Sequence, residues 1–265
     1  MDRLNRGQDD QERLAILNWL TTIEHGPRQQ SLTDQREPGT GQWLLESTEY
    51  RVWRDTTGQT LFCYGIPGAG KTMTTATVVD SLTADGGGRF PETGIAYVYF
   101  NFQQQNEQQA DRSLASLVRQ LSWGCPVLPA SVKSLYDQHQ GKRTRPSLQQ
   151  LSETLQSVAA AYSRVFIAID ALDEYRSSRN DRSAFLREIF ALQAKVAVNL
   201  FATSRVIPDI ASEFKSAVSL EIRATDHDVR KYIKGNINQL PSFVRRSPQL
   251  QAEIEDKIAQ STQGM

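Results

Sequence analysis

The sequence predicts an α/β fold in which a five-stranded parallel sheet is sandwiched by helices, with helical extensions at both ends. Short apolar segments of strand length alternate along the chain with longer segments whose apolar residues recur at helical spacing. One short segment, Val165–Ile169, is apolar at every position, which is typical of a strand buried on both faces of a sheet. Strands that alternate with helices form parallel sheets whose faces the helices cover. The 265 residues are enough for one such domain with a peripheral helical part.

Five segments have the composition of buried strands. The first, Thr-Leu-Phe-Cys-Tyr, is rich in the β-branched and aromatic residues that strands favour. The predicted strands are Thr60–Tyr64, Ile95–Phe100, Val165–Ile169, Val196–Thr203 and Val218–Ile222.

Helices are predicted where apolar residues recur at i, i+3, i+4 and i+7. They are Leu14–Leu20, Trp43–Trp53, Thr72–Leu82, Leu114–Leu121, Leu148–Val158, Phe185–Ala194 and Asp226–Asn238. The polar segment His25–Gly41 is interrupted by Pro27, Pro38, Gly39 and Gly41 and is predicted to be a loop or linker. We therefore expect an N-terminal helix and linker (1–38), a central domain (39–222) and the start of a helical module (223–265).

The charge balance excludes some partners. Lys plus Arg and Asp plus Glu each total 30, so no overall field draws the protein to nucleic acid or to an anionic membrane. The longest apolar runs are of strand length, and the charged start Met1–Asp10 does not fit a secretory signal. We expect a cytoplasmic protein that has neither nucleic acid nor a membrane as its partner.

A glycine-rich turn joins the first predicted strand to the next helix. Residues 65–72, Gly-Ile-Pro-Gly-Ala-Gly-Lys-Thr, fit the P-loop pattern G-x-x-x-x-G-K-[ST] in the strand–turn–helix context that it requires. Glycines let backbone N–H groups approach phosphate oxygens, and the helix N-terminus adds partial positive charge. Lys71 is expected to contact the β- and γ-phosphates, and Thr72 to coordinate Mg²⁺. The expected nucleotide contacts are Gly65, Pro67, Gly68, Ala69, Gly70, Lys71, Thr72 and Met73.

A carboxylate ends the apolar strand Val165–Ile169. Ligands of open α/β sheets bind beyond the carboxyl ends of the strands, so Asp170 is placed to hold the Mg²⁺ together with Thr72. Asp173 and Glu174 follow within four residues, and one of them would orient the attacking water as a catalytic carboxylate. The alternative for this pair is a solvated turn.

A second polar strand end is Thr203-Ser204-Arg205. One of these residues is expected to face the γ-phosphate from a neighbouring strand, with Arg205 in the catalytic set as the residue that senses or stabilises its charge. The alternative is a turn in which the serine caps the next element and the arginine is solvated.

The three motifs, in this order, resemble the NACHT family of signalling P-loop ATPases, within the STAND class. The specific part is Asp170-Ala171-Leu172-Asp173-Glu174: aspartate, a small residue, any residue, then two acidic residues. The family more often has glycine where Ala171 stands. Residues 39–45, Gly-Thr-Gly-Gln-Trp-Leu-Leu, and Ile66–Ala69 are similar to fungal NACHT proteins that carry ankyrin, WD or TPR repeats.

The resemblance implies a cytoplasmic, NLR-like switch of innate immunity or heterokaryon incompatibility. Its cofactors would be ATP or ADP with Mg²⁺, and its partners nucleotide and further copies of itself in a nucleotide-dependent oligomer. Effector, winged-helix and repeat domains are expected outside this chain, which would then be a fragment or a truncated product.

Other classes of protein share the P-loop. A small-molecule or nucleotide kinase would need an arginine-bearing lid, for which Arg176, Arg179 and Arg182 are candidates. A GTPase usually has Asn-Lys-x-Asp, which is absent from the sequence, so ATP is preferred. The last alternative is a catalytically silent module that binds nucleotide for stability.

Overall fold

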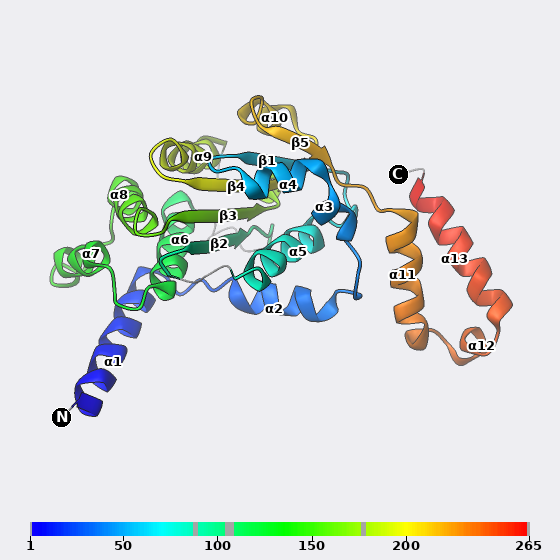
Figure 1. Cartoon of the computed structure of the whole chain (residues 1–265), viewed down its shortest axis with the longest axis horizontal. Helices are drawn as coiled ribbons and strands as arrows, with labels where there is room; N and C mark the ends of the chain where they lie inside the picture. Colours follow the sequence, from blue (N-terminus) through cyan, green and yellow to red (C-terminus); the bar gives the residue numbers. More distant parts are fainter. Residues whose placement is uncertain (1, 87–89, 104–108, 176–178, 264–265) are drawn as a thin grey trace.

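A five-stranded parallel sheet forms the centre of the computed structural model, which describes residues 2–263 except 87–89, 104–108 and 176–178. The strand order is β2-β3-β4-β1-β5 (Figure 1). The strands are β1 (Thr60–Tyr64), β2 (Thr93–Tyr99), β3 (Arg164–Asp170), β4 (Val198–Ser204) and β5 (Val218–Glu221). The predicted fold class is confirmed.

The register of the sheet brings the ends of its central strands together. Tyr64 of β1 is level with Ser204 of β4, and Tyr99 of β2 is level with Asp170 of β3. Because all strands run in the same direction, the polar residues that end β3 and β4 lie at the same edge as the glycine-rich loop that follows β1.

One face of the sheet is covered by α3 (Gln42–Glu46), α4 (Thr48–Asp55) and α5 (Lys71–Ala84). Trp53 lies at the centre of this layer, in edge contact with Phe166 and Phe201, and its indole N–H donates to the carbonyl of Leu200 at 2.9 Å. The predicted single helix Trp43–Trp53 is in fact two helices, because Ser47 ends α3 and its hydroxyl accepts from a backbone N–H in the first turn of α4.

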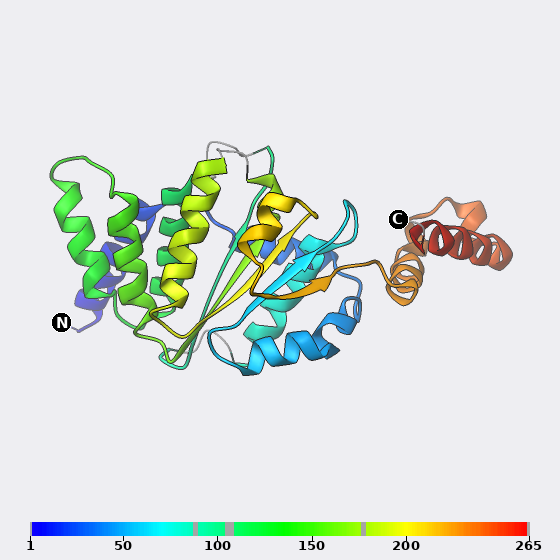
Figure 2. The same cartoon turned by 90° about the horizontal axis from the view of Figure 1, so that it is seen from above.

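The other face is covered by α6 (Ala110–Gly124), α8 (Leu148–Ala159), α9 (Arg179–Gln193) and α10 (Pro208–Glu213) (Figure 2). Outside them lie α7 (Ala130–Gln140) and α1 (Asp2–Leu20). The sequence did not predict α7 or α10. Arg13 of α1 donates to four carbonyl groups at the end of α6, those of Ser122, Trp123, Cys125 and Pro126. This arginine therefore fastens α1 to the layer beneath it.

A helix stands where the sequence predicted a loop. Within His25–Gly41, the structure forms α2 (Gly26–Gln35), with a proline in its first turn, where a proline favours a helix start. The Gln29 amide donates to the carbonyl of Ala76 at 3.0 Å, so α2 lies along α5. The prediction was wrong because Pro27 and the polar composition, which are typical of a loop, belong here to a helix with one buried residue, Leu32.

Helices also follow the sheet. They are α11 (Asp226–Asn236), the 3₁₀ turn η3 (Ile237–Gln239), α12 (Ser242–Arg245) and α13 (Pro248–Gln263). Figure 1 shows them beyond the end of the sheet where the glycine-rich loop that follows β1 lies. Arg230 of α11 pairs with Asp226 in its own helix at 2.9 Å and with Asp256 of α13 at 2.8 Å, and the second ion pair joins the two helices. None of the described helices is long and apolar enough to cross a membrane.

Candidate functional site

The loop between β1 and α5 is open on the side of its glycines. Gly68 and Gly70 have φ of 81° and 92°, a left-handed conformation that costs glycine little. A Cβ at either position would meet no atom within 4 Å. At Gly65, by contrast, a Cβ would lie 2.6 Å from the carbonyl oxygen of Ile222, just after β5. The loop is thus anchored where it leaves the sheet and uncovered where its N–H groups would meet phosphate.

The first residues of α5 point back to the loop and across to β3. The Lys71 ammonium donates to the carbonyl oxygens of Gly65 and Ile66, at 2.9 and 2.8 Å. Burial lowers the pKa of this ammonium group, and the nearby carboxylates act in the opposite direction. The Thr72 hydroxyl donates to Asp170 Oδ2 at 2.7 Å. The two proposed metal ligands, separated by 98 residues, are therefore in contact.

Asp170 is 1% exposed, and its carboxylate accepts hydrogen bonds from three hydroxyl groups. Besides Thr72 on Oδ2, Thr75 and Thr203 donate to Oδ1 at 2.9 and 2.7 Å. Burial raises the pKa of the Asp170 carboxyl, and these three hydrogen bonds oppose the shift. The carboxylate is held in a fixed orientation at the edge of the sheet.

After Asp170 the chain makes a tight turn. Ala171 has φ of 56°, and the next three residues form the 3₁₀ turn η2 (Leu172–Glu174). An alanine in the left-handed region is strained, whereas the glycine more usual in the family would not be. This turn brings Asp173 and Glu174 back to the edge of the sheet where the glycine-rich loop lies, which is called the phosphate edge below.

The two acidic residues of the turn have different partners. Asp173, 3% exposed at its side chain, accepts from Arg205 Nε at 2.7 Å and from the Arg205 backbone N–H at 2.9 Å. Glu174 Oε2 accepts from the backbone N–H of Phe102 at 3.3 Å. Asp173 thus contacts the half-exposed Arg205 through both of its carboxylate oxygens, whereas Glu174 accepts a backbone N–H through Oε2.

A cavity of about 1100 Å³ extends from the loop. The predicted contacts Gly68, Ala69, Gly70 and Met73 form one wall of it. The other predicted contacts, Gly65, Pro67, Lys71 and Thr72, are not among the residues that line the cavity.

The remaining walls come from segments for which the sequence predicted no contact. Residues 34–43 and 222–224, together with α11, supply both apolar and charged side chains. They include Arg36, Glu37, Trp43, Asp228, Val229, Tyr232, Ile233 and Asn236.

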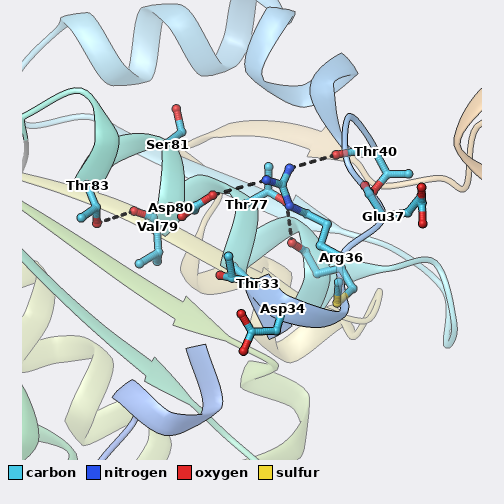
Figure 3. A network of polar contacts seen from close by, with 12 residues as sticks. Thr33, Asp34, Arg36, Glu37, Thr40, Thr77, Val79, Asp80, Ser81 and Thr83 are labelled. Carbon is cyan, nitrogen blue, oxygen red and sulfur yellow. Dashed lines mark hydrogen bonds and ion pairs between the residues drawn. The ribbon is translucent and has the colours of Figure 1, made fainter. Parts of the chain in front are cut away.

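Arg36 holds the turn before α3 against α5. Its guanidinium pairs with Asp80 at 3.3 Å and donates to the carbonyl of Thr40 at 3.4 Å, as Figure 3 shows. The next residue of that turn, Gly41, donates its N–H to Asp228 of α11 at 3.0 Å. A helix from the C-terminal part of the chain is thereby fastened to a turn from the N-terminal part, and residues of both line the cavity.

Sequence signals for these walls were present but weak. Gly39 and Gly41 both have φ of 77°, which accounts for two glycines so close together before α3. Thr225 begins α11 as expected, its hydroxyl accepting the N–H of Asp228 at 3.1 Å. The contact of Asp228 with Gly41 spans 187 residues, and no local pattern predicts it.

The residues present fit Mg²⁺ and a nucleoside triphosphate. The glycine backbone is open, α5 begins at Lys71 with the unpaired N–H groups of a helix start, and a hydroxyl and a carboxylate meet at 2.7 Å beside it. Mg²⁺ takes oxygen ligands and keeps several waters, so Thr72, Asp170 and phosphate oxygens suit it.

Together, the sheet order and the loop define the P-loop ATPase fold. The family model "Nephrocystin 3, N-terminal" matches residues 39–205, and the chain belongs to that family. Since the family is a NACHT-associated region, the resemblance predicted from the motifs is confirmed.

The chain also matches solved structures at low sequence identity and with TM-scores below 0.5. A Walker-type ATPase of Pyrococcus abyssi has a TM-score of 0.49 and 11% identity, with 84% of this chain and 64% of that one covered. For the Aeropyrum pernix Orc1 protein in complex with DNA, the TM-score is 0.46 and the identity 13%, with 86% and 54% covered. DnaA of Aquifex aeolicus bound to AMPPCP has a TM-score of 0.42 and 15% identity, with 76% of this chain and 52% of that one covered. The chain thus spans about half to two thirds of these proteins, and no curated protein matches it.

Proposed function

We propose that this protein is an ATP-binding signalling switch that binds Mg-ATP, hydrolyses it slowly and couples its nucleotide state to self-association. The observation that carries the proposal is the contact of Thr72 with Asp170 at 2.7 Å beside the open glycine loop. A hydroxyl and a carboxylate in this relation hold Mg²⁺ against bound phosphates.

Each polar group at the phosphate edge has a distinct role in this proposal. Lys71 and the loop N–H groups bind the β- and γ-phosphates, while Thr72 and Asp170 hold the metal ion. Glu174 orients the attacking water. Arg205 contacts the γ-phosphate, and Asp173 acts by positioning Arg205 rather than by touching the water.

The cavity supplies the coupling. The nucleotide base and ribose would lie between the turn at 36–41 and α11, in contact with Met73 and with the apolar residues of α11. A ligand shifts a conformational equilibrium only through different contacts in the two states. Because α11 belongs to the helices that follow the sheet, occupancy of the cavity would bias how those helices pack.

The broader assignments belong to the same proposal. The nucleotide-binding domain is taken as residues 39–222, with a helix and linker before it and a helical module after it. We place the protein in the cytoplasm, in an NLR-like or heterokaryon-incompatibility-like pathway, with nucleotide and its own copies as partners. The family membership and the separate wall formed by α11 support this assignment.

Calorimetry with ATP and ADP, with and without Mg²⁺, tests the binding site. Lys71→Ala is expected to weaken ATP binding about a hundredfold, since it removes a charge-assisted contact to phosphate. Lys195→Ala is the matched control, because this exposed lysine precedes β4 at the opposite edge of the sheet and pairs with Gln156. Unchanged ATP affinity in a folded Lys71→Ala protein would refute the site.

A second experiment separates a switch from a kinase. Phosphate release without an acceptor should be slow, and sedimentation should show more self-association with a non-hydrolysable ATP analogue than with ADP. Fast phosphoryl transfer to a small acceptor by a monomer that is indifferent to nucleotide would favour the kinase.

A further inference from the structure

Three threonine hydroxyls surround Asp170, and they divide between its two oxygens. Thr72, from the phosphate-binding motif, donates to Oδ2. Thr75 and Thr203 donate to Oδ1. One oxygen therefore faces the phosphate-binding loop, while the other is held from behind by side chains of α5 and β4.

Thr203 is the more constrained of the two residues on Oδ1. It is fully buried, and its hydroxyl has a single proton, which it donates to Asp170 at 2.7 Å. The same oxygen accepts the backbone N–H of Ala171 at 3.0 Å. Thr203 thus connects the carboxylate with the residue whose left-handed conformation begins the turn to Asp173 and Glu174.

Among the residues that the structure describes, Thr75 has a second hydrogen-bond acceptor and Thr203 has one. The Thr75 hydroxyl lies 3.1 Å from the carbonyl oxygen of Lys71, one turn earlier in α5, and 2.9 Å from Asp170 Oδ1. Because the hydroxyl has one proton to donate, it can donate it to the carbonyl of Lys71 within the helix when the carboxylate moves. The geometry makes Thr75 an auxiliary donor and Thr203 the principal one.

We propose that Thr203 is a positioning residue for the metal site: by holding Oδ1 it presents Oδ2 of Asp170 to the metal ion and to Thr72. The proposal rests on the Mg-nucleotide function proposed above. In this proposal the end of β4 has two separate roles. Thr203 orients the metal-binding carboxylate, and Arg205, two residues later, contacts the γ-phosphate. Thr203 itself does not touch the nucleotide.

The first test measures how much Mg²⁺ nucleotide binding needs. Thr203→Val keeps the shape of the side chain and removes the hydroxyl, so the Mg²⁺ concentration for half-maximal ATP binding should rise about tenfold. ATP affinity in EDTA should stay as in the unmodified protein, and Thr203→Ser should restore the Mg²⁺ requirement. Thr154→Val is the matched control, because Thr154 is a buried threonine of α8 whose hydroxyl bonds within its own helix.

A second readout requires no nucleotide. Hydrogen exchange at the Ala171 amide, followed by NMR in the nucleotide-free protein, should be about tenfold or more faster in Thr203→Val than in the unmodified protein, because the acceptor of that N–H is gone. Thr75→Val should leave this amide protected and should raise the Mg²⁺ requirement less than Thr203→Val does.

The outcomes separate the two proposals. If the unmodified protein binds no Mg-nucleotide, the proposed function fails, and the exchange rate of Ala171 then decides whether Thr203 holds the turn. If Mg-nucleotide binds and a folded Thr203→Val protein keeps the normal Mg²⁺ requirement and the normal exchange rate, the positioning role is overturned. If Thr203→Val does not fold, Thr203→Ala and Thr75→Val in the same two measurements replace it, and an unchanged Mg²⁺ requirement in both overturns the proposal.

Discussion

The ion pair between Asp173 and Arg205 gives the sharpest quantitative prediction about the phosphate edge. The Asp173 side chain is 3% exposed and that of Arg205 is 48% exposed, with Nε and Oδ2 at 2.7 Å. Exposed pairs contribute up to about 1 kcal/mol, and breaking a fully buried pair costs about 3–5 kcal/mol. A pair with one buried and one half-exposed member should therefore have a coupling free energy of about 1–2 kcal/mol.

A double-mutant cycle measures this coupling. The free energy of unfolding in urea is determined for the unmodified protein, Asp173→Asn, Arg205→Ala and the double variant, all without nucleotide. Calorimetry on the same four proteins then compares ATP with ADP. Arg205→Ala should weaken ATP binding about tenfold to a hundredfold more than ADP binding, because only ATP has the γ-phosphate. Asp173→Asn should show the same preference at smaller amplitude, because Arg205 keeps its charge and loses its anchor.

The exposed pair Arg54–Asp55, at 2.8 Å, is the control cycle and should give no measurable coupling. Additive effects of Asp173→Asn and Arg205→Ala on stability would refute the claim that Asp173 positions Arg205. Equal losses of ATP and ADP affinity in Arg205→Ala would show that the arginine does not contact the γ-phosphate.

Three further predictions concern other parts of the molecule. Glu174→Gln should slow phosphate release about a hundredfold or more in single-turnover assays while ATP affinity is retained, and unchanged turnover would exclude Glu174 as the residue that orients water. Burial lowers the pKa of His25 from 6.5 to about 4, so its contribution to stability is complete above pH 6.5 and decreases as the pH falls to 4. Between pH 7 and pH 4.5 the free energy of unfolding in urea should therefore decrease by about 2–3 kcal/mol less in His25→Gln than in the unmodified protein. Parallel pH profiles of stability for the two proteins would contradict this prediction. Arg13→Met should lower the free energy of unfolding by about 1–3 kcal/mol, because the carbonyl groups at the end of α6 lose their donor, and an unchanged midpoint in urea would show that α1 is not held there.

The central strands β3 and β4 could be predicted because burial on both faces of a sheet leaves near-continuous apolar runs in the sequence. Val165–Ile169 is apolar throughout and forms most of β3. The P-loop was equally readable, because its residues are consecutive and their types are required by the backbone. Asp170 was predictable as the polar end of a strand, since the carboxyl ends of parallel strands share an edge.

The parts that escaped prediction depend on contacts between distant segments or on weak local signals. Helix α2 buries little of its surface, so its apolar periodicity is faint and its proline was misleading. The wall formed by α11 depends on Asp228 reaching Gly41, which only the folded chain brings together. The separate partners of Asp173 and Glu174 follow from the left-handed turn at Ala171, and sequence spacing alone left the two carboxylates equivalent.

The place of β5 in the sheet limits how this protein can be shortened for experiments. A chain cut to the matched region, residues 39–205, would lack β5, which lies on the free side of β1. The backbone of the strand that carries the phosphate-binding loop would then be an unpaired edge, and such edges recruit strands from other molecules. The carbonyl of Ile222 that lies against Gly65 would also be missing. Self-association of so short a chain would therefore report exposed backbone and not the nucleotide-dependent assembly proposed for the protein.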